Sequence, residues 1–263
     1  MPPPAIRVCS SDMARFTGHN PYVSLADSEI SFWKRNPKLA TWLGREKIEE
    51  KDEIVCNVKN LSQEDRERLS KDLNLSEEAD VATIAHKIRK DVVQYVAQAR
   101  STKEADKRLD QMDTTVKTLL LDCVKQESQK ERGTLRETAA IENTEKQTGR
   151  IIDERNDKFY TKRMFTLNSG EYTFNVILTG KIDGKFADSH EIVEMKERRN
   201  RLFHKVVDYE RVQLHCYMVL TNENKSTLIE TFNGDSLCHQ VEFDAEFWND
   251  CLEKLEAFLT HVL

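Results

Sequence analysis

The sequence predicts an α/β (α+β) fold in which a mixed central β-sheet is flanked by helices and carries a helical insertion. Residues 62–140 are almost free of glycine and repeat their apolar positions at helical spacing. From residue 172 onward, short runs rich in β-branched and aromatic residues alternate with amphipathic segments. We therefore expect one domain over 1–263, with 55–125 as the helical insertion and 130–243 as the core.

The N-terminal half is expected to be mainly helical. The first 50 residues indicate turns and short helices, including one that residues 10–12 cap and Gly18 ends, and a second over 26–35. Two or three helices are predicted between 62 and 140. The charge run 103–107 is interpreted as a solvated helix face or a connector.

The C-terminal half predicts the sheet. Its expected elements are strands over 172–183 and 191–196, a helix over 208–220, strands over 226–232 and 237–243, and an amphipathic helix over 244–262. No internal repeat is visible. This order of elements indicates a mixed sheet flanked by helices.

Composition describes a soluble globular protein, and the scattered cysteines, which are expected to be reduced thiols, indicate an intracellular compartment. Hydrophobic residues make up 38% and charged residues 33% of the chain, and no apolar run approaches the roughly 20 residues of a membrane span. We expect neither a targeting segment nor contact with a membrane. The net charge of −6 argues against a protein that coats nucleic acid through bulk positive charge, but a local basic groove can still bind phosphates.

The six cysteines are scattered, without any Cys-x-x-Cys pair. Zinc and iron–sulfur sites need clustered thiolates, so the sequence predicts neither, and specifically no iron–sulfur cluster. A disulfide framework is not expected in a chain of this size without a signal peptide.

Two acidic positions carry the clearest chemical signal. Asp183 ends an apolar strand and is followed by glycine, and Glu194 lies on the next short strand, across an expected turn at 185–189. Glu194 and Lys196 are two residues apart and so project from one face. On a strand otherwise made of Ile, Val and Met, such charges cost free energy unless they find partners. A divalent cation bound by Asp183 and Glu194 would offset that cost.

These residues predict a site for Mg²⁺ or Mn²⁺. Mg²⁺ prefers oxygen ligands and keeps several waters, so two carboxylates and the carbonyl of Met195 would leave positions for water and a phosphate oxygen. The metal would polarise the phosphate and activate the water, and Lys196 would position that water and offset charge in the transition state. The alternative is an exposed Glu–Lys pair with Asp183 as a turn residue, since a Glu-x-Lys motif alone is common.

Two helical motifs accompany these strands: Gly-x-x-x-Glu ending at Glu137, and Gln-x-x-x-Tyr formed by Gln213 and Tyr217 on one helical face. This order of helical acid, strand Asp, Glu-x-Lys and Gln-x-x-x-Tyr resembles the RecB-like and lambda-exonuclease-like (YqaJ-like) branch of the PD-(D/E)XK nucleases. The segment 11–22, a Ser-Asp helix before Asn-Pro-Tyr, resembles the opening of YqaJ-like nucleases. The resemblance covers residues 10–50 and 130–235 and is specific as an ordered set.

The resemblance implies a restriction-endonuclease-like core that hydrolyses phosphodiester bonds in DNA, working from duplex ends in the 5′ to 3′ direction. It implies that Glu137 helps to bind the metal or its waters. It also implies that Gln213 orients a phosphate, the scissile strand or the catalytic lysine, with Tyr217 in support. The alternatives are a solvated Glu137, and a packing role for Gln213 and Tyr217. The insertion is longer than a minimal member needs, so its role is open.

Two sets of residues are candidates for contact with DNA phosphates. One follows the second strand and comprises Arg198, Arg199 and Arg201, for which a solvated charge run is the alternative. The other can cradle a terminal 5′-phosphate with a helix N-terminus and guanidinium groups, and comprises Arg7, Ser10, Ser11 and Arg15. An ordinary helix N-cap is the alternative for this second set.

Two other functions fit the same fold. One is a sequence- or structure-specific endonuclease with the same site, and the other is a non-catalytic module that binds nucleic acid or protein. The complete Asp/Glu/Lys set argues against the second. A homo-oligomer is compatible with the sequence, which does not define the oligomeric state.

Overall fold

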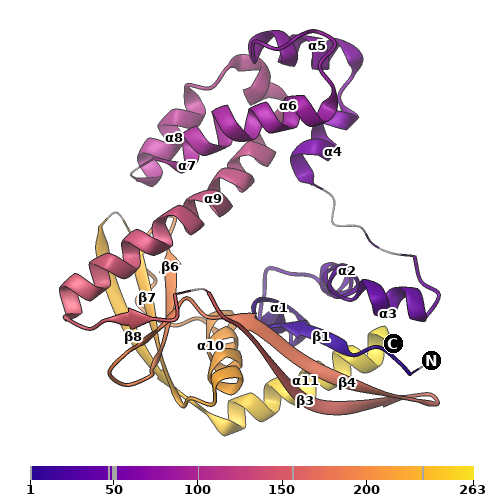
Figure 1. The fold of residues 1–263 in the computed structure, drawn as a ribbon, viewed down its shortest axis with the longest axis vertical. Helices are drawn as coiled ribbons and strands as arrows, with labels where there is room; N and C mark the ends of the chain where they lie inside the picture. Colours follow the sequence, from indigo (N-terminus) through magenta and orange to yellow (C-terminus); the bar gives the residue numbers. More distant parts are fainter. Residues whose placement is uncertain (1, 47, 49–51, 100, 156, 233) are drawn as a thin grey trace.

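The structure, a computed structural model, describes residues 2–46, 48, 52–99, 101–155, 157–232 and 234–263. In Figure 1 its lower part combines β-strands and helices, and its upper part is helical. The predicted fold class is confirmed. In the described residues, however, the strands form two mixed sheets rather than one.

The first sheet has the order β1-β4-β3. Its strands are β1 (Ile6–Cys9), β3 (Phe159–Ser169) and β4 (Tyr172–Lys181). The central strand β4 pairs in parallel with β1 and antiparallel with β3. Phe174, Val176 and Leu178 are buried at alternate positions of β4, as expected of a strand with one face on the core.

The second sheet has the order β2-β5-β6-β7-β8. Its strands are β2 (Ile152–Asp153), β5 (Gly184–Phe186), β6 (Ile192–Glu197), β7 (Lys225–Phe232) and β8 (Asp235–Glu242). The central strand β6 pairs antiparallel with β5 and in parallel with β7. The chain passes from the first sheet to the second between β4 and β5, which is where Asp183 lies.

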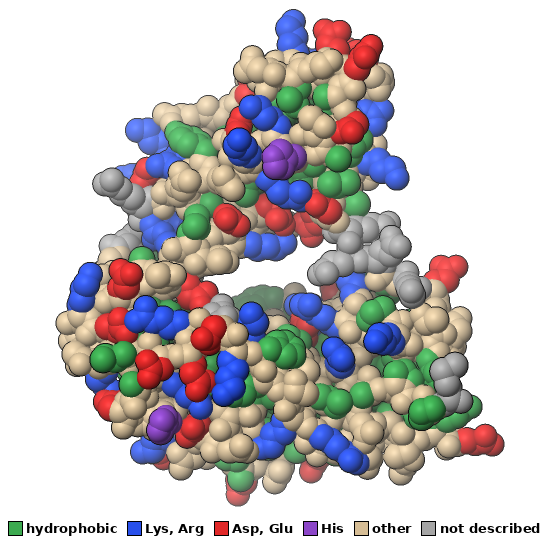
Figure 2. Space-filling model, in the orientation of Figure 1, with side chains coloured by type: hydrophobic (Ala, Val, Ile, Leu, Met, Phe, Trp, Pro, Cys, Tyr) green, Lys and Arg blue, Asp and Glu red, His purple; other side chains and the backbone are tan. Residues whose placement is uncertain are grey.

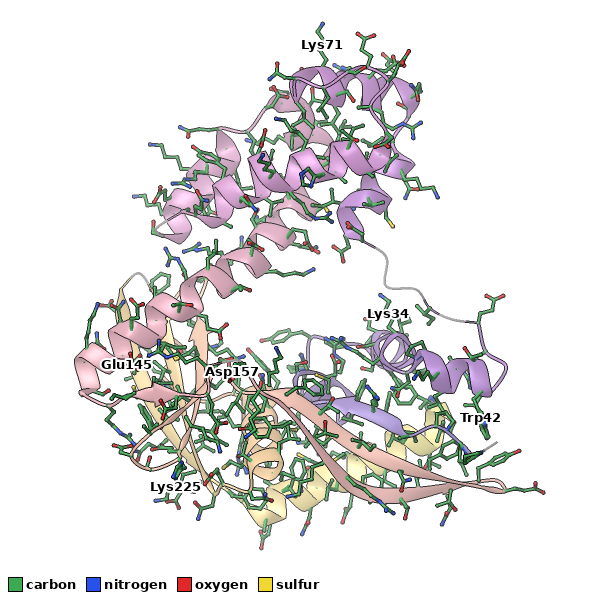
Figure 3. All side chains as sticks on the ribbon, in the orientation of Figure 1. Lys34, Trp42, Lys71, Glu145, Asp157 and Lys225 are labelled. Atoms are coloured by element: carbon green, nitrogen blue, oxygen red, sulfur yellow. The ribbon has the colours of Figure 1, made fainter. Side chains whose placement is uncertain are left out.

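Besides the long helix described below, five helices of the described part of the chain lie around these sheets. They are α1 (Ser10–Phe16), α2 (Leu25–Arg35), α3 (Pro37–Trp42), α10 (Asp208–Thr221) and α11 (Ala245–Val262). The largest hydrophobic cluster joins β1, β4, α1, α2, α10 and α11. Helix α10 contacts both sheets, α1 and α11, so it holds this part together. Trp42, labelled in Figure 3, lies against the rings of Tyr172 and Phe174 on β4.

The upper part has a hydrophobic cluster of its own, which includes Ile54, Leu69, Ile84 and Leu120. Its elements are α4 (Glu53–Asn60), α5 (Gln63–Asp72), α6 (Val81–Ile88), the π-helical η1 (Arg89–Val93), α7 (Gln94–Ala97) and α8 (Thr102–Asp110). The sequence predicted only two or three helices between residues 62 and 140. The difference arises because polar N-caps start new helices, with side-chain caps at Ser62, Asp80, Ser101 and Asp113.

Helix α9 (Thr114–Thr148) connects the two parts over 35 residues (Figure 1). Its first half contributes Val116, Leu120 and Val124 to the upper cluster, and Ile141 packs with β2 and β6. Near its end, the Glu145 carboxylate accepts hydrogen bonds from Ile152 N at 2.8 Å and from Arg155 at 2.5 Å, and Figure 3 shows Glu145 beside the second sheet. The functional division of 1–263 into an insertion (55–125) and a catalytic core (130–243) stays a prediction.

An open space lies between the upper part and the core in the view of Figure 2. Comparison with Figure 1 shows α9 along one side of it and the connection between α1 and α2 on the core side. Among the helices that the structure describes, none is both long enough and apolar enough to span a membrane.

Candidate active site

A cavity of about 380 Å³ lies where α9, β6 and α10 meet the segment that follows β4. The predicted residues that line it are Glu137, Asp183, Glu194, Met195, Lys196, Gln213 and Tyr217. The fold therefore brings all four sequence motifs to one place, although they come from a long helix, a sheet junction, a strand and a second helix.

Asp183 lies at the junction between the two sheets, and its Oδ2 accepts a hydrogen bond from Met195 N at 2.8 Å. Burial and the nearby Glu194 carboxylate raise the pKa of Asp183 well above its usual range, although the hydrogen bond from Met195 opposes this. The next residue has to be glycine, because a Cβ on Gly184 would lie 2.4 Å from Ile152 Cγ2. The sharp passage between the sheets thus places the carboxylate beside β6.

Glu194 is 2% exposed and points into the cavity from β6. Its Oε1 accepts a hydrogen bond from Lys196 Nζ at 2.5 Å. Its Oε2 is buried and has no hydrogen-bond partner among the residues that the structure describes. The alternation predicted for this strand is confirmed, since Val193 and Met195 pack into a different hydrophobic cluster from Ile192.

Lys196 is the first member of a hydrogen-bonded chain that leads into α10. Its Nζ donates to Gln213 Oε1 at 3.2 Å, and Gln213 Nε2 donates to Tyr217 OH at 2.6 Å. Tyr217 is 4% exposed and is joined by a further side-chain hydrogen bond to Ser10. Burial and the negative charges of Glu194 and Asp183 raise the pKa of Tyr217 well above its usual range. The phenol therefore stays neutral and can act as a hydrogen-bonding support.

Glu137 lines the cavity from α9, and its charge contributes to the raised pKa of Asp183. Two residues that were not predicted as part of the site fix this helix. Arg132 and Arg136 bind Glu197 Oε1 of β6 at 3.0 and 2.6 Å. Their signal is visible in retrospect, because two arginines four residues apart share one face of a helix.

The donor set of the cavity fits a divalent cation. Three carboxylates, those of Glu137, Asp183 and Glu194, line the cavity together with the Lys196 ammonium, which is hydrogen-bonded to Glu194. Burial and the charge of Glu194 raise the pKa of Asp183, and Glu194 Oε2 is buried without a hydrogen-bond partner among the described residues. An oxygen-liganded cation such as Mg²⁺ would relieve both.

A second group of metal-type donors lies elsewhere, between the start of the chain and α11. Ligand atoms of His19, Asp250 and Cys251 lie within 4.8 Å of one another. Asp250 is already paired with Lys254 at 2.8 Å, and burial raises the pKa of the Cys251 thiol to about 12. A thiol must lose its proton to bind a metal, so this group fits a cation less well than the cavity does.

The prediction that Arg198 contacts phosphates is wrong. Arg198 is 7% exposed, its Nε donates to Glu230 Oε2 at 2.7 Å, and its two terminal nitrogens donate to the Glu210 carboxylate. Each of its three nitrogens thus donates to a buried carboxylate inside the protein. Arg199 and Arg201 are exposed on the segment between β6 and α10, so they remain accessible to a ligand.

The N-terminal set is arranged differently from the expectation. Helix α1 has Cys9 as its N-cap and no side-chain cap, and Ser10 is buried against Tyr217 rather than available to a phosphate. Ser11 is exposed. Arg7 is exposed on β1, and Arg15 Nε lies 3.3 Å from the carboxylate of Asp12.

The model of the PD-(D/E)XK nuclease superfamily matches residues 60–250 of the sequence. The chain belongs to this superfamily. It is therefore a nuclease-type hydrolase whose substrate is nucleic acid, and members of the superfamily typically use divalent metal ions. Comparison with curated proteins gave no match.

The chain is similar to several solved structures, among them three of low sequence identity. The crystal structure of SSO0001 has 12% identity and a TM-score of 0.38 over 64% of this chain and 74% of that one. LHK-Exo in complex with dAMP has 15% identity and a TM-score of 0.37, and the alkaline exonuclease LHK-Exo from Laribacter hongkongensis has 14% and 0.36. Both cover 80% of this chain and 90% of theirs. Likeness at these values carries no argument about activity.

Proposed function

We propose that this PD-(D/E)XK protein is a Mg²⁺- or Mn²⁺-dependent deoxyribonuclease that digests duplex DNA from its ends, in the 5′ to 3′ direction. The observation that carries the proposal is the cavity in which Asp183, Glu194 and Lys196 meet, with a buried Glu194 oxygen that lacks a protein partner among the described residues. Such a site suits a hydrolysis in which charge develops on a phosphate.

The residues that line the cavity would have distinct roles in this reaction. Asp183, Glu194 and the Met195 carbonyl would hold the cation, with Glu137 binding it or its waters. The bound ion would polarise the phosphate and lower the pKa of a coordinated water. Burial alone would lower the pKa of Lys196, but the charge and hydrogen bond of Glu194 and the charge of Asp183 raise it above its usual value. Lys196 thus stays protonated and can offset charge in the transition state.

The direct test uses DNA labelled at the 5′ or the 3′ end, in linear and covalently closed circular form, with Mg²⁺ or with excess chelator. Linear duplexes should be shortened progressively from the 5′ end in Mg²⁺ only. Closed circles should resist, because they offer no end. Rapid cutting of closed circles would favour an endonuclease instead, and full activity in chelator would exclude the metal site.

A preference for 5′-phosphorylated ends is expected, with Arg15 as the recognising residue. A terminal phosphate carries more charge than an internal phosphodiester, so a guanidinium near the entry of the strand favours it. Linear DNA with 5′-phosphates should be digested faster than the same DNA with 5′-hydroxyls, and Arg15→Ala should reduce the difference. Arg163→Ala, which removes an exposed arginine of β3, is the matched control. Equal rates on both ends in the unsubstituted protein would contradict the expectation.

Gln213→Ala should slow turnover far more than it weakens DNA binding. The side chain links Lys196 to Tyr217, so it positions a group that acts mainly in the transition state. One such contact is worth about 10²–10³ in rate. Single-turnover rates, dissociation constants and melting temperatures would be compared. A purely structural Gln213 would instead lower the melting temperature and leave the rate of the folded fraction unchanged.

A further inference from the structure

The face of α10 that lines the cavity continues beyond the catalytic lysine. Tyr209, Gln213 and Tyr217 follow one another at intervals of four residues and so form one stripe along the helix. Tyr217 is buried, Gln213 contacts Lys196, and Tyr209 is half-buried at the start of the helix. The stripe therefore leads outward from Lys196 and ends in an aromatic ring.

A second ring lies against Tyr209. Tyr22 is 84% exposed, the highest value among the large hydrophobic side chains that the structure describes. Its ring centroid lies 6.4 Å from that of Tyr209, with 72° between the ring planes. The backbone of Tyr22 is held by a hydrogen bond from its N–H to Asn20 Oδ1 at 3.1 Å. A large apolar ring that stays in water forgoes the stabilisation of burial, so such exposure points to a ligand.

The two rings lie beside the candidate active site. Tyr209 lies one helical turn before Gln213, whose Oε1 accepts a hydrogen bond from Lys196 Nζ at 3.2 Å, so Tyr209 follows the site along the same side of α10. The connection between α1 and α2, which carries Tyr22, lies on the side of the core that faces the open space (Figures 1 and 2). A strand that reaches Lys196 from this space can pass over the tyrosines.

The segment between β6 and α10, which leads to Tyr209, carries charges that suit a nucleic-acid strand. The segment that enters α10 exposes Arg199, Arg201 and Lys205. Cations attract the phosphate backbone without reading its sequence, and aromatic rings stack on bases of any identity. Basic side chains beside exposed rings are the combination found in sites for unpaired strands.

We propose that Tyr22 and Tyr209 form a stacking site for an unpaired nucleobase of the strand whose phosphodiester bond lies at Lys196. The inference rests on the proposed function, since it takes the strand to be the nuclease's substrate. It adds a contact that holds one base apart from its complement next to the reacting phosphate.

The test measures binding of a fluorescent single-stranded oligodeoxynucleotide in Mg²⁺ by the full chain carrying Asp183→Asn, which prevents cleavage. In this background Tyr22→Ala should raise the dissociation constant by about 5- to 150-fold, the range of one base–aromatic stack. Tyr22→Phe should restore binding, because it keeps the ring. Tyr209→Leu, which keeps apolar bulk without an aromatic ring, should also weaken binding. Tyr172→Ala is the matched control, since Tyr172 is 46% exposed on the first sheet and packs against Trp42.

The deciding step replaces one nucleotide at a time by an abasic residue. At one position the abasic strand should bind as weakly as Tyr22→Ala, and Tyr22→Ala should cause no further loss on that strand. The stacking site would be overturned if Tyr22→Ala bound the strand with unchanged affinity. It would also be overturned if, at every abasic position, Tyr22→Ala weakened binding as much as it does on the intact strand. Cleavage by the unsubstituted chain is measured separately. If the unsubstituted chain does not cleave DNA, but Tyr22→Ala causes no further loss of binding on the abasic strand, the proposed function alone is refuted. If cleavage is normal and the effects of Tyr22→Ala and the abasic residue are independent, the stacking site alone is refuted.

Discussion

Asp183→Asn, Glu194→Gln and Lys196→Met are each expected to reduce the single-turnover rate of DNA cleavage by about 10³-fold or more, because each removes a group that acts on the reacting phosphate. The first two substitutions keep the shape of the side chain and remove a charge that is proposed to bind the metal. Lys196→Met keeps the apolar stem and removes the ammonium. Circular dichroism and melting temperature would show that the fold persists.

The control for these variants is Glu242→Gln. Glu242 pairs with Lys225 on the surface of β8 and is 77% exposed, so its removal should leave the rate unchanged. In metal-free buffer, Asp183→Asn should also raise the melting temperature, because it removes one of two buried, mutually repelling carboxylates. Wild-type rates in all three variants would disprove the site.

Glu230→Ala is expected to be the most destabilising of the substitutions considered, by about 3–5 kcal/mol, because it breaks a buried ion pair. Glu230 is fully buried and accepts hydrogen bonds from Arg198 at 2.7 Å, from the N–H groups of Phe203 and His204 at 2.8 Å each, and from His239 at 2.9 Å. Its loss leaves buried donors without an acceptor. Urea unfolding followed by tryptophan fluorescence would measure the change, and a loss below about 1 kcal/mol would contradict it.

The same carboxylate predicts a dependence of stability on pH. Burial opposes its ionisation, but hydrogen bonds from two backbone N–H groups, His239 and Arg198 lower the pKa of Glu230 from 4.5 to about 2. A group with a depressed pKa contributes its full stabilisation above the unfolded value of 4.5 and loses it as the pH falls toward 2. The free energy of unfolding of the wild type should therefore decline over this window. Glu230→Gln should decline less, and Glu242→Gln should follow the wild type.

Much of the candidate site could be predicted from the sequence because its residues come in short motifs. Glu194 and Lys196 share a strand face, and Gln213 and Tyr217 share a helix face, so local periodicity alone pairs them. The order of the motifs then placed Asp183 with them, and the structure gathers all five around one cavity.

The partners of these residues depend on contacts between distant segments, which local periodicity does not encode. Arg198 looked like a surface cation because its neighbours in sequence are basic, yet Glu210 and Glu230 hold it inside the protein. Ser10 looked like a helix cap, but it packs on the backbone of β4, where a Cβ on Gly180 would lie 2.4 Å from its Oγ.

The fold was predicted in class but not in every element. Strand β1 has four residues, too few to show an alternating pattern. The predicted single sheet is divided because the chain turns sharply at Asp183, and a turn of this kind is not visible in the spacing of apolar residues.

Helix α9 mechanically connects the helical upper part to the candidate active site. At 1.5 Å per residue its 35 residues extend over about 50 Å, with the upper hydrophobic cluster on one arm and Glu137 on the other. Gly133 lies one turn before Glu137, and nothing lies within 4 Å of the position that its Cβ would take. Glycine weakens a helix interior by about 0.5–1 kcal/mol relative to alanine, so α9 is expected to bend most easily beside Glu137. A displacement of the far arm is therefore expected to bend the helix next to the Glu137 carboxylate, which lines the candidate active site.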